Sequence, residues 1–348
     1  MTMARQTELS ERKAAILRAL VRHYIRTGEP VGSEALTHTA GLDVSSATIR
    51  NELASLEELG YLTQPHTSAG RAPTDLAYRL FVDMLPPRSR LRDWERRAIV
   101  GFFDEALADI DDILRGTTHL LSRLTRYASL ALAPSVRQAA VVRAELVPLG
   151  SGTLLLLVFD NGRVEKRLID MPHEQGEQDL TERSRALMDA FIGKTVSKAR
   201  AVARERANAP ADPERDLFAR VEEALGSIAE AGEVEHLFMG GVANIAADEA
   251  FDRRETLRQI YETLERESSM LRLLREAAAQ PVAVMIGREN PLPEMWEASV
   301  VAAPYGAEGG AVGTIGVVGP TRMDYGAAIS AVRAVAERLS RAVEALKG

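Results

Sequence analysis

The chain begins with a pattern that few folds satisfy: three short helix-forming stretches, a short strand and a turn, all within residues 10–74. Each stretch opens on a residue that caps helices well and closes on a glycine, and its apolar residues recur at helical spacing. The three stretches are 10–27, 33–40 and 45–59. The strand "YLTQP" and the turn "HTSAGRAP" follow, and 74–85 is again helical. This order is typical of a winged helix-turn-helix, in which the third helix enters the major groove of DNA.

A helical wheel of the third stretch separates an apolar face from a polar one. Ile49, Leu53 and Leu56 cluster on one side and are expected to pack into the domain. On the opposite side, Asn51 suits a two-point contact with adenine, and Arg50 suits guanine or phosphate. The residues expected to face the major groove are Ser46, Thr48, Arg50, Asn51 and Ser55. The alternative is an ordinary surface helix, since any such helix has polar residues opposite its apolar face.

Residues beside this face are expected to contact the DNA backbone. Ser45 lies at the positively polarised start of the helix, where phosphate binds well. The loop after the strand is the expected wing, in which Arg71 among small residues suits a narrow minor groove. The hydroxyls of Thr67 and Ser68 suit phosphates, and His66 either contacts phosphate or packs at the base of the wing. An ordinary solvated hairpin loop is the alternative.

Composition limits the function further. The 348-residue chain carries a net charge of −7, which argues against indiscriminate coating of nucleic acid. Residues 1–100 hold 14 Lys and Arg against 12 Asp and Glu, so any nucleic-acid surface is small and N-terminal. There is no cysteine, and the six histidines lack metal-ligand spacing, so we expect no metal and no cofactor. No Ser-His-Asp arrangement or close carboxylate pair indicates an enzyme.

The hydropathy of the chain does not indicate a membrane protein. The longest strongly apolar run, 154–159, has the length of a strand and is far too short for a membrane span. The N-terminus lacks the charged stretch and apolar core of a signal peptide. We therefore expect a cytoplasmic protein without a membrane partner.

The rest of the chain predicts an α+β, multidomain protein. "PPRSR" at 86–90 is the best linker candidate, and strand patterns occur in 139–171 and again in 281–319. "DNG" at 160–162 predicts a hairpin turn. Because neither strand group alone makes a sheet with covered edges, we predict one α+β domain split by an insertion. The expected boundaries are 1–85 for the winged helix, 86–178 and 280–348 for the split domain, and 179–279 for the insertion.

Two further patterns allow more than one interpretation. Residues 252–279 form one long helical pattern with Leu257, Leu264 and Leu271 seven apart. This stripe suits a dimer seam, but a stripe so short more often packs within one domain. The Gly-rich segment 306–320 lacks the Lys-Ser/Thr of a P-loop and is expected to be a hairpin.

Several segments resemble the signature blocks of the HrcA family of heat-inducible transcription repressors. They are "GEPVGSEAL", "SSATIRNELASLEELGYLTQPHTSAGRAPT" and "YRLFVD" near the N-terminus, and "IGREN", "APYG" and "GTIGVVGPTRMDYG" near the C-terminus. The resemblance implies a winged-helix DNA-binding domain, a GAF-like α+β domain and, inserted in it, a dimerising domain.

The same resemblance implies a function. A homodimer would bind an inverted-repeat operator on double-stranded DNA upstream of chaperone operons, and its activity would depend on the GroE chaperonin. One alternative is a winged-helix regulator that senses a small molecule through the GAF-like domain. Another is a winged helix that contacts protein instead of DNA.

Overall fold

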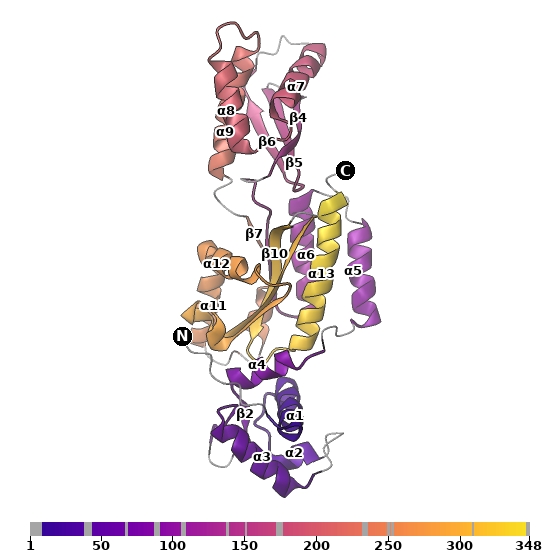
Figure 1. Ribbon diagram of the computed structural model, residues 1–348, viewed down its shortest axis with the longest axis vertical. Helices are drawn as coiled ribbons and strands as arrows, with labels where there is room; N and C mark the ends of the chain where they lie inside the picture. Colours follow the sequence, from indigo (N-terminus) through magenta and orange to yellow (C-terminus); the bar gives the residue numbers. More distant parts are fainter. Residues whose placement is uncertain are drawn as a thin grey trace.

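The computed structural model describes residues 9–37, 44–66, 69–86, 91–105, 109–136, 139–149, 152–171, 177–231, 236–248, 251, 254–307 and 310–345. Figure 1 shows an elongated molecule with the winged helix at one end, a central body of sheet and helices, and a smaller α+β part at the other end. None of the described helices combines the length and hydropathy that a membrane span requires.

The N-terminal part is the predicted winged helix-turn-helix. Its elements are α1 (Glu11–Thr27), α2 (Ser33–Thr37), α3 (Ser46–Glu58), β1 (Leu62–Thr63), β2 (Ala72–Pro73) and α4 (Asp75–Asp83). The Ser10 hydroxyl accepts a hydrogen bond from the N–H of Lys13 at 3.3 Å, and Gly28 ends α1 with a φ of 72°. Both boundaries of the first helix are therefore as the capping residues predict.

The central body is a five-stranded antiparallel sheet covered by helices on both faces (Figure 1). Its strands, in spatial order, are β7 (Leu237–Gly240), β3 (Ala128–Leu132), β10 (Gly310–Pro320), β9 (Ala298–Ala307) and β8 (Ala283–Ile286). The helices α5 (Asp93–Glu105), α6 (Ile110–Thr125) and α13 (Tyr325–Ala345) pack on one face. The helices α10 (Ala243–Ala247), α11 (Arg254–Glu265) and α12 (Glu267–Ala277) lie on the other. β9 and β10 form the hairpin expected from the Gly-rich segment.

The third part has a sheet and a core of its own. Its elements are β4 (Val141–Leu149), β5 (Gly152–Phe159), β6 (Val164–Ile169), α7 (Glu177–Phe191), α8 (Val196–Ala207) and α9 (Arg215–Ala231). The antiparallel strands lie in the order β4-β5-β6, and the turn from β5 to β6 contains Gly162 with a φ of 81°, as "DNG" predicts. Its buried side chains form a separate hydrophobic cluster that extends from Val136 to Ile228.

This arrangement differs from the predicted grouping of the strands and from one predicted helix. The strands of 139–171 do not share a sheet with those of 281–319, and the separate hydrophobic cluster spans 136–228, whereas the insertion was expected at 179–279. The central sheet is completed by β3 and β7, which the sequence did not identify as its members. The predicted long helix of 252–279 is broken at Arg266, whose backbone is extended (φ −80°, ψ 91°). Leu264 is buried against the central sheet, so the leucine stripe packs within the body.

The winged helix is fastened to the central body through α4. Arg79 pairs with Glu289 by two hydrogen bonds, of which that from Nε to Oε1 is 2.8 Å, and its Nη2 also donates to the carbonyl of Val284 at 2.5 Å. The hydrogen bond with Glu289 raises the pKa of Arg79. Asp75, at the start of α4, accepts from the backbone N–H of Arg288 at 3.0 Å. The segments "YRLFVD" and "IGREN", far apart in the sequence, therefore meet at this junction.

Close packing accompanies these polar contacts. Gly287 has a φ of 51°, and a Cβ there would lie 2.3 Å from a carboxylate oxygen of Asp75, so the turn requires glycine. The rings of Tyr78 and Tyr325 lie 5.8 Å apart, and burial raises the pKa of both hydroxyls. The Tyr325 hydroxyl is 2.8 Å from that of Ser299. The junction is thus fixed by apolar and polar contacts together.

The inserted part joins the body through Arg163, which follows the turn between β5 and β6. Its side chain is 8% exposed, and its two terminal nitrogens lie 3.1 Å from Asp111 of α6 and 3.1 Å from Glu165. The Asn161 amide donates to the carbonyl of Ser135 at 2.9 Å. The same turn that closes the hairpin therefore anchors it to the body.

Glu289→Gln tests the junction on α4. The amide keeps the shape of the carboxylate but loses its charge, and the two side chains are 29% and 34% exposed. We expect a loss of about 1 kcal/mol in the free energy of unfolding, discounted for this exposure. Backbone amides of α4 should exchange faster with solvent. The measurements are urea unfolding and hydrogen exchange.

Glu297→Gln is the matched control, because Glu297 is exposed and has no ion pair among the described residues. Equal exchange of the α4 amides in the two variants would contradict the proposed fastening.

Candidate nucleic-acid interface

The third helix, α3, is held by the packing that its wheel predicts. Ile49 and Leu56 are fully buried, and Leu53 is nearly so, against a core shared with α1 and α4. Glu52, on the side toward α1, lies 3.9 Å from both Arg12 and Lys13. These contacts fix the orientation of α3, and its remaining face points away from the domain.

The start of α3 is built from hydroxyl groups. Ser45 is the N-cap: its hydroxyl accepts from the N–H of Thr48 at 3.2 Å and lies 3.0 Å from the Thr48 hydroxyl. The Ser46 hydroxyl lies 3.0 Å from that of Ser33, at the start of α2. Ser46 and Thr48 are only partly exposed, as is Ser55 nearer the other end. The hydroxyls of Ser45, Ser46 and Thr48 therefore all take part in the structure of the motif, and of the three residues only Ser45 is exposed.

Arg50 and Asn51 have a different environment. Both are exposed, and neither side chain has a hydrogen bond or ion pair among the described residues. Ala47 and Ala54 are exposed on the same face and add no bulk. This face leaves a guanidinium and a carboxamide free, which are the groups that form two-point contacts with guanine and adenine.

The base of the wing is a small three-stranded arrangement. β1 pairs with β2, and Arg71, just before β2, exchanges backbone hydrogen bonds of 2.8 and 2.9 Å with Val31. A Cβ at Gly70 would lie 2.4 Å from the backbone of Val31, so only glycine fits there. The Arg71 Nε donates to Glu57 of α3 at 2.7 Å.

This geometry differs from the expected wing. Arg71 lies at the base of the wing and is 23% exposed, bound to α3, whereas the sequence suggested an arginine free to enter the minor groove. His66 is exposed on the wing. Thr67 and Ser68 lie outside the described residues. Sequence reasoning missed Glu57, Val31 and Gly70, because their partners are set by the fold and lie far along the chain.

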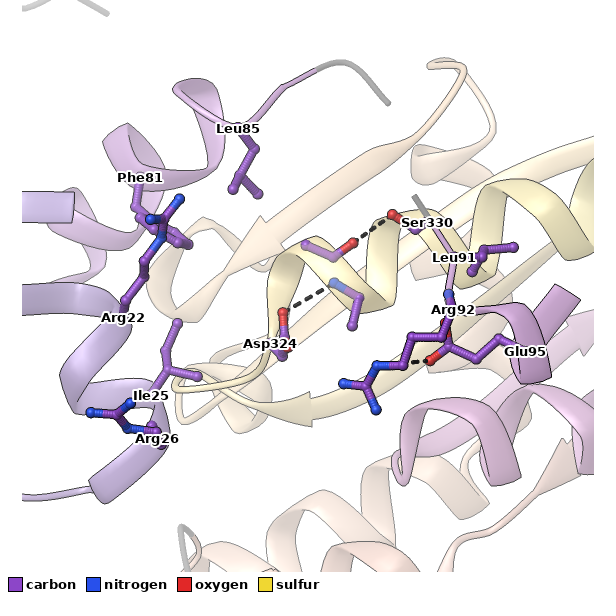
Figure 2. A pocket seen from close by; sticks show the side chains of 12 residues that line it. Arg22, Ile25, Arg26, Phe81, Leu85, Leu91, Arg92, Glu95, Asp324 and Ser330 are labelled. Carbon is purple, nitrogen blue, oxygen red and sulfur yellow. Dashed lines mark hydrogen bonds and ion pairs between the residues drawn. The ribbon is translucent and has the colours of Figure 1, made fainter. Parts of the chain in front are cut away.

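A cleft of about 580 Å³ lies between the winged helix and the central body, and Figure 2 shows the side chains that line it. Arg22 and Arg26 of α1 lie on one side, and the starts of α5 and α13 on the other. The two acidic residues that line the cleft accept hydrogen bonds from nearby backbone groups. Asp324 accepts from the N–H of Ala327 at 3.0 Å, and Glu95 accepts from the N–H of Arg92 at 2.6 Å. The cleft is a seam between the winged helix and the central body. The described His, Asp and Glu residues form no group of three suited to a metal ion.

Two family profiles match this chain. The profile described as "Winged helix-turn-helix transcription repressor, HrcA DNA-binding" matches residues 8–84, and that described as "HrcA protein C terminal domain" matches 111–329. The chain belongs to the HrcA family. The domain over 8–84 coincides with the winged helix described above, so α3 is the third helix of an HrcA DNA-binding domain.

Individual relatives agree with the profiles. A protein from Nocardioides sp. named "Heat-inducible transcription repressor HrcA" is 42% identical over 337 residues, covering 96% of this chain and 98% of that protein. One of the same name from Thermobifida fusca is 44% identical over 332 residues, covering 94% and 95%. A crystal structure of a hypothetical protein superposes with a TM-score of 0.72 at 25% identity, covering 97% of this chain and 100% of that one.

Membership confirms the broad predictions. As an HrcA-family protein, the chain is a heat-inducible transcription repressor with a winged-helix DNA-binding domain, and it is not an enzyme. The predicted α+β, multidomain fold with an N-terminal winged helix is also confirmed.

Gly70→Ala tests the close approach at the wing base. The added methyl group would meet the backbone of Val31, so we expect a loss of about 1–3 kcal/mol in the free energy of unfolding of the winged helix. Gly32→Ala is the control, because a Cβ there meets nothing within 4 Å. Urea unfolding measures both, and equal stability of the two variants would contradict the assigned contact.

Proposed function

We propose that this HrcA-family repressor binds, as a homodimer, an inverted-repeat operator on double-stranded DNA upstream of chaperone operons. The observation that carries the proposal is the pair of exposed, unbonded side chains on the outer face of α3, Arg50 and Asn51. A dimer suits an inverted repeat because two related helices then read two half-sites. Such a protein acts where the chromosome lies, so the cytoplasm is its proposed location.

Each candidate residue has a proposed role. Asn51 and Arg50 read base edges in the major groove, while Ser46, Thr48 and Ser55 line the same side of α3 at partial exposure. The exposed start of α3 at Ser45 suits a phosphate. Proposed backbone contacts from the wing are His66, Thr67, Ser68 and Arg71. The position of Arg71 at the wing base, next to α3, favours phosphate over the minor groove as its target.

An uncovered sheet face in the inserted part supports the homodimer. The helices α7 to α9 bury Leu155 and Leu157 on one face of the β4-β5-β6 sheet. On the other face Val147, Leu154 and Leu168 are register neighbours across the three strands. Leu168 is 67% exposed. Contiguous exposed apolar side chains of this kind mark interfaces, and we propose that a second copy covers them.

Dependence on the GroE chaperonin is the remaining part of the proposal. The chain consists of three parts whose assembly brings together residues more than 200 positions apart, as at Arg79 and Glu289. Multidomain chains of this kind expose apolar surface while they fold, which makes them candidates for chaperonin assistance. Heat would draw the chaperonin to other unfolded proteins and leave the repressor inactive, so that transcription rises on heating, which agrees with the name "Heat-inducible transcription repressor HrcA" of the relatives.

Asn51→Ala tests the reading face. If Asn51 contacts a base, the variant should bind the operator more weakly by about 1–3 kcal/mol and lose its preference at one base pair of each half-site. Binding to unrelated DNA should change little. A gel-shift titration with the operator and with single-base variants measures both, and unchanged operator affinity would remove Asn51 from the interface.

Leu168→Glu tests the dimer face. A charge at this position should oppose pairing of the two sheets, so we expect monomers in sedimentation or light scattering at concentrations where the unaltered chain is dimeric. Ile192→Glu is the control: Ile192 is 54% exposed but follows α7, outside that face. If Leu168→Glu stays dimeric, the interface lies elsewhere.

A further inference from the structure

Two neighbouring acids, Glu57 and Glu58, lie at the C-terminal end of α3. Carboxylates near DNA repel its phosphates, so a DNA-reading helix gains nothing from them on charge alone. The two differ in environment. Glu58 is exposed and has no ion pair among the described residues, whereas the Glu57 side chain is 33% exposed and accepts from the Nε of Arg71 at 2.7 Å.

Arg71 is fixed at both its backbone and its side chain. Its N–H and its carbonyl are both bonded to Val31, which leaves the residue little freedom at the base of the wing. Glu57 uses only the Nε of the guanidinium. The two terminal nitrogens, Nη1 and Nη2, have no hydrogen bond among the described residues. Four of the five N–H donors of the guanidinium are therefore available to another partner.

We propose that Glu57 is a positioning residue for DNA binding: it holds Arg71 so that Nη1 and Nη2 meet one backbone phosphate where α3 and the wing come together. A guanidinium binds a phosphate well through two parallel N–H groups. Because Glu57 and Val31 already hold the arginine, little side-chain freedom is lost when DNA binds. The inference rests on the proposed contact between α3 and the operator.

The acidic residue then strengthens binding to a polyanion, which separates this inference from two simpler ones. General electrostatics predicts that removal of either acid tightens binding. A purely internal role, in which the ion pair only fastens the wing, predicts lower stability with no change in the number of phosphates contacted.

The experiment measures operator affinity as a function of salt for Glu57→Ala, Glu57→Gln and the matched control Glu58→Ala. We expect Glu57→Ala to bind about tenfold more weakly, as for loss of a hydrogen bond to a charged group, and Glu58→Ala to bind equally or more tightly. The operator affinity of Glu57→Gln should lie between those of the two alanine variants, since its amide oxygen can still accept a hydrogen bond from the Nε of Arg71. The slope of log affinity against log salt should fall by about 1 in Glu57→Ala, for one phosphate lost.

A second set of variants tests the inference even if Glu57→Ala also lowers the free energy of unfolding. Arg71→Lys keeps the charge but not the paired donors, so it should lose affinity as Glu57→Ala does. In an Arg71→Ala background, Glu57→Ala should cause no further loss. Operator binding by Glu57→Ala as tight as that of the unaltered chain, or an undiminished salt slope, overturns the inference. Failure of the unaltered chain to bind any inverted repeat would instead overturn the proposed function.

Discussion

The ion pair between Arg79 and Glu289 connects the DNA-binding winged helix to the central body. It joins α4, the last element of the winged helix, to the turn after β8, and its partners are 210 positions apart in the chain. The hydrogen bond from the N–H of Arg288 to Asp75 and the tilted rings of Tyr78 and Tyr325 complete the contact. Because these groups lie between α4 and the central sheet, they set the direction in which α3 points from the body.

A second arginine has the same role at the other end. Arg163 joins the inserted part to α6. The central body lies between the winged helix and the inserted part (Figure 1), and Arg79 and Arg163 form one polar junction on each side. If two copies pair through the face that contains Leu168, the distance between their α3 helices depends on both junctions. The spacing of half-sites in an operator is a geometric property of the dimer. A rigid path from α3 through Arg79 and Arg163 to the dimer face is therefore what recognition of an inverted repeat requires.

Local signals in the sequence were sufficient for local structure. Ser10 and Gly28 bound the first helix, and Gly162 closes the predicted hairpin, because capping and turn chemistry depend on a few adjacent residues. Pairing of strands could not be predicted in this way. Every residue of β3 is buried, so it lacks the alternation that identifies a strand, and the strands of 139–171 show nothing that says which sheet they join. The site divides similarly: the wheel separated the packed face of α3 from its polar face, but the hydrogen bond of Arg71 with Glu57, across 14 positions, follows only from the folded wing.

Hydroxyl-radical footprinting on a DNA fragment that carries the inverted repeat from this organism's own chaperone operon tests the central claim most directly. The measurement uses the full chain, with and without chaperonin. The account predicts two protected patches of equal length, related by the two-fold axis of the repeat and filled at the same protein concentration. Protection of a single half-site, or none under either condition, would contradict it.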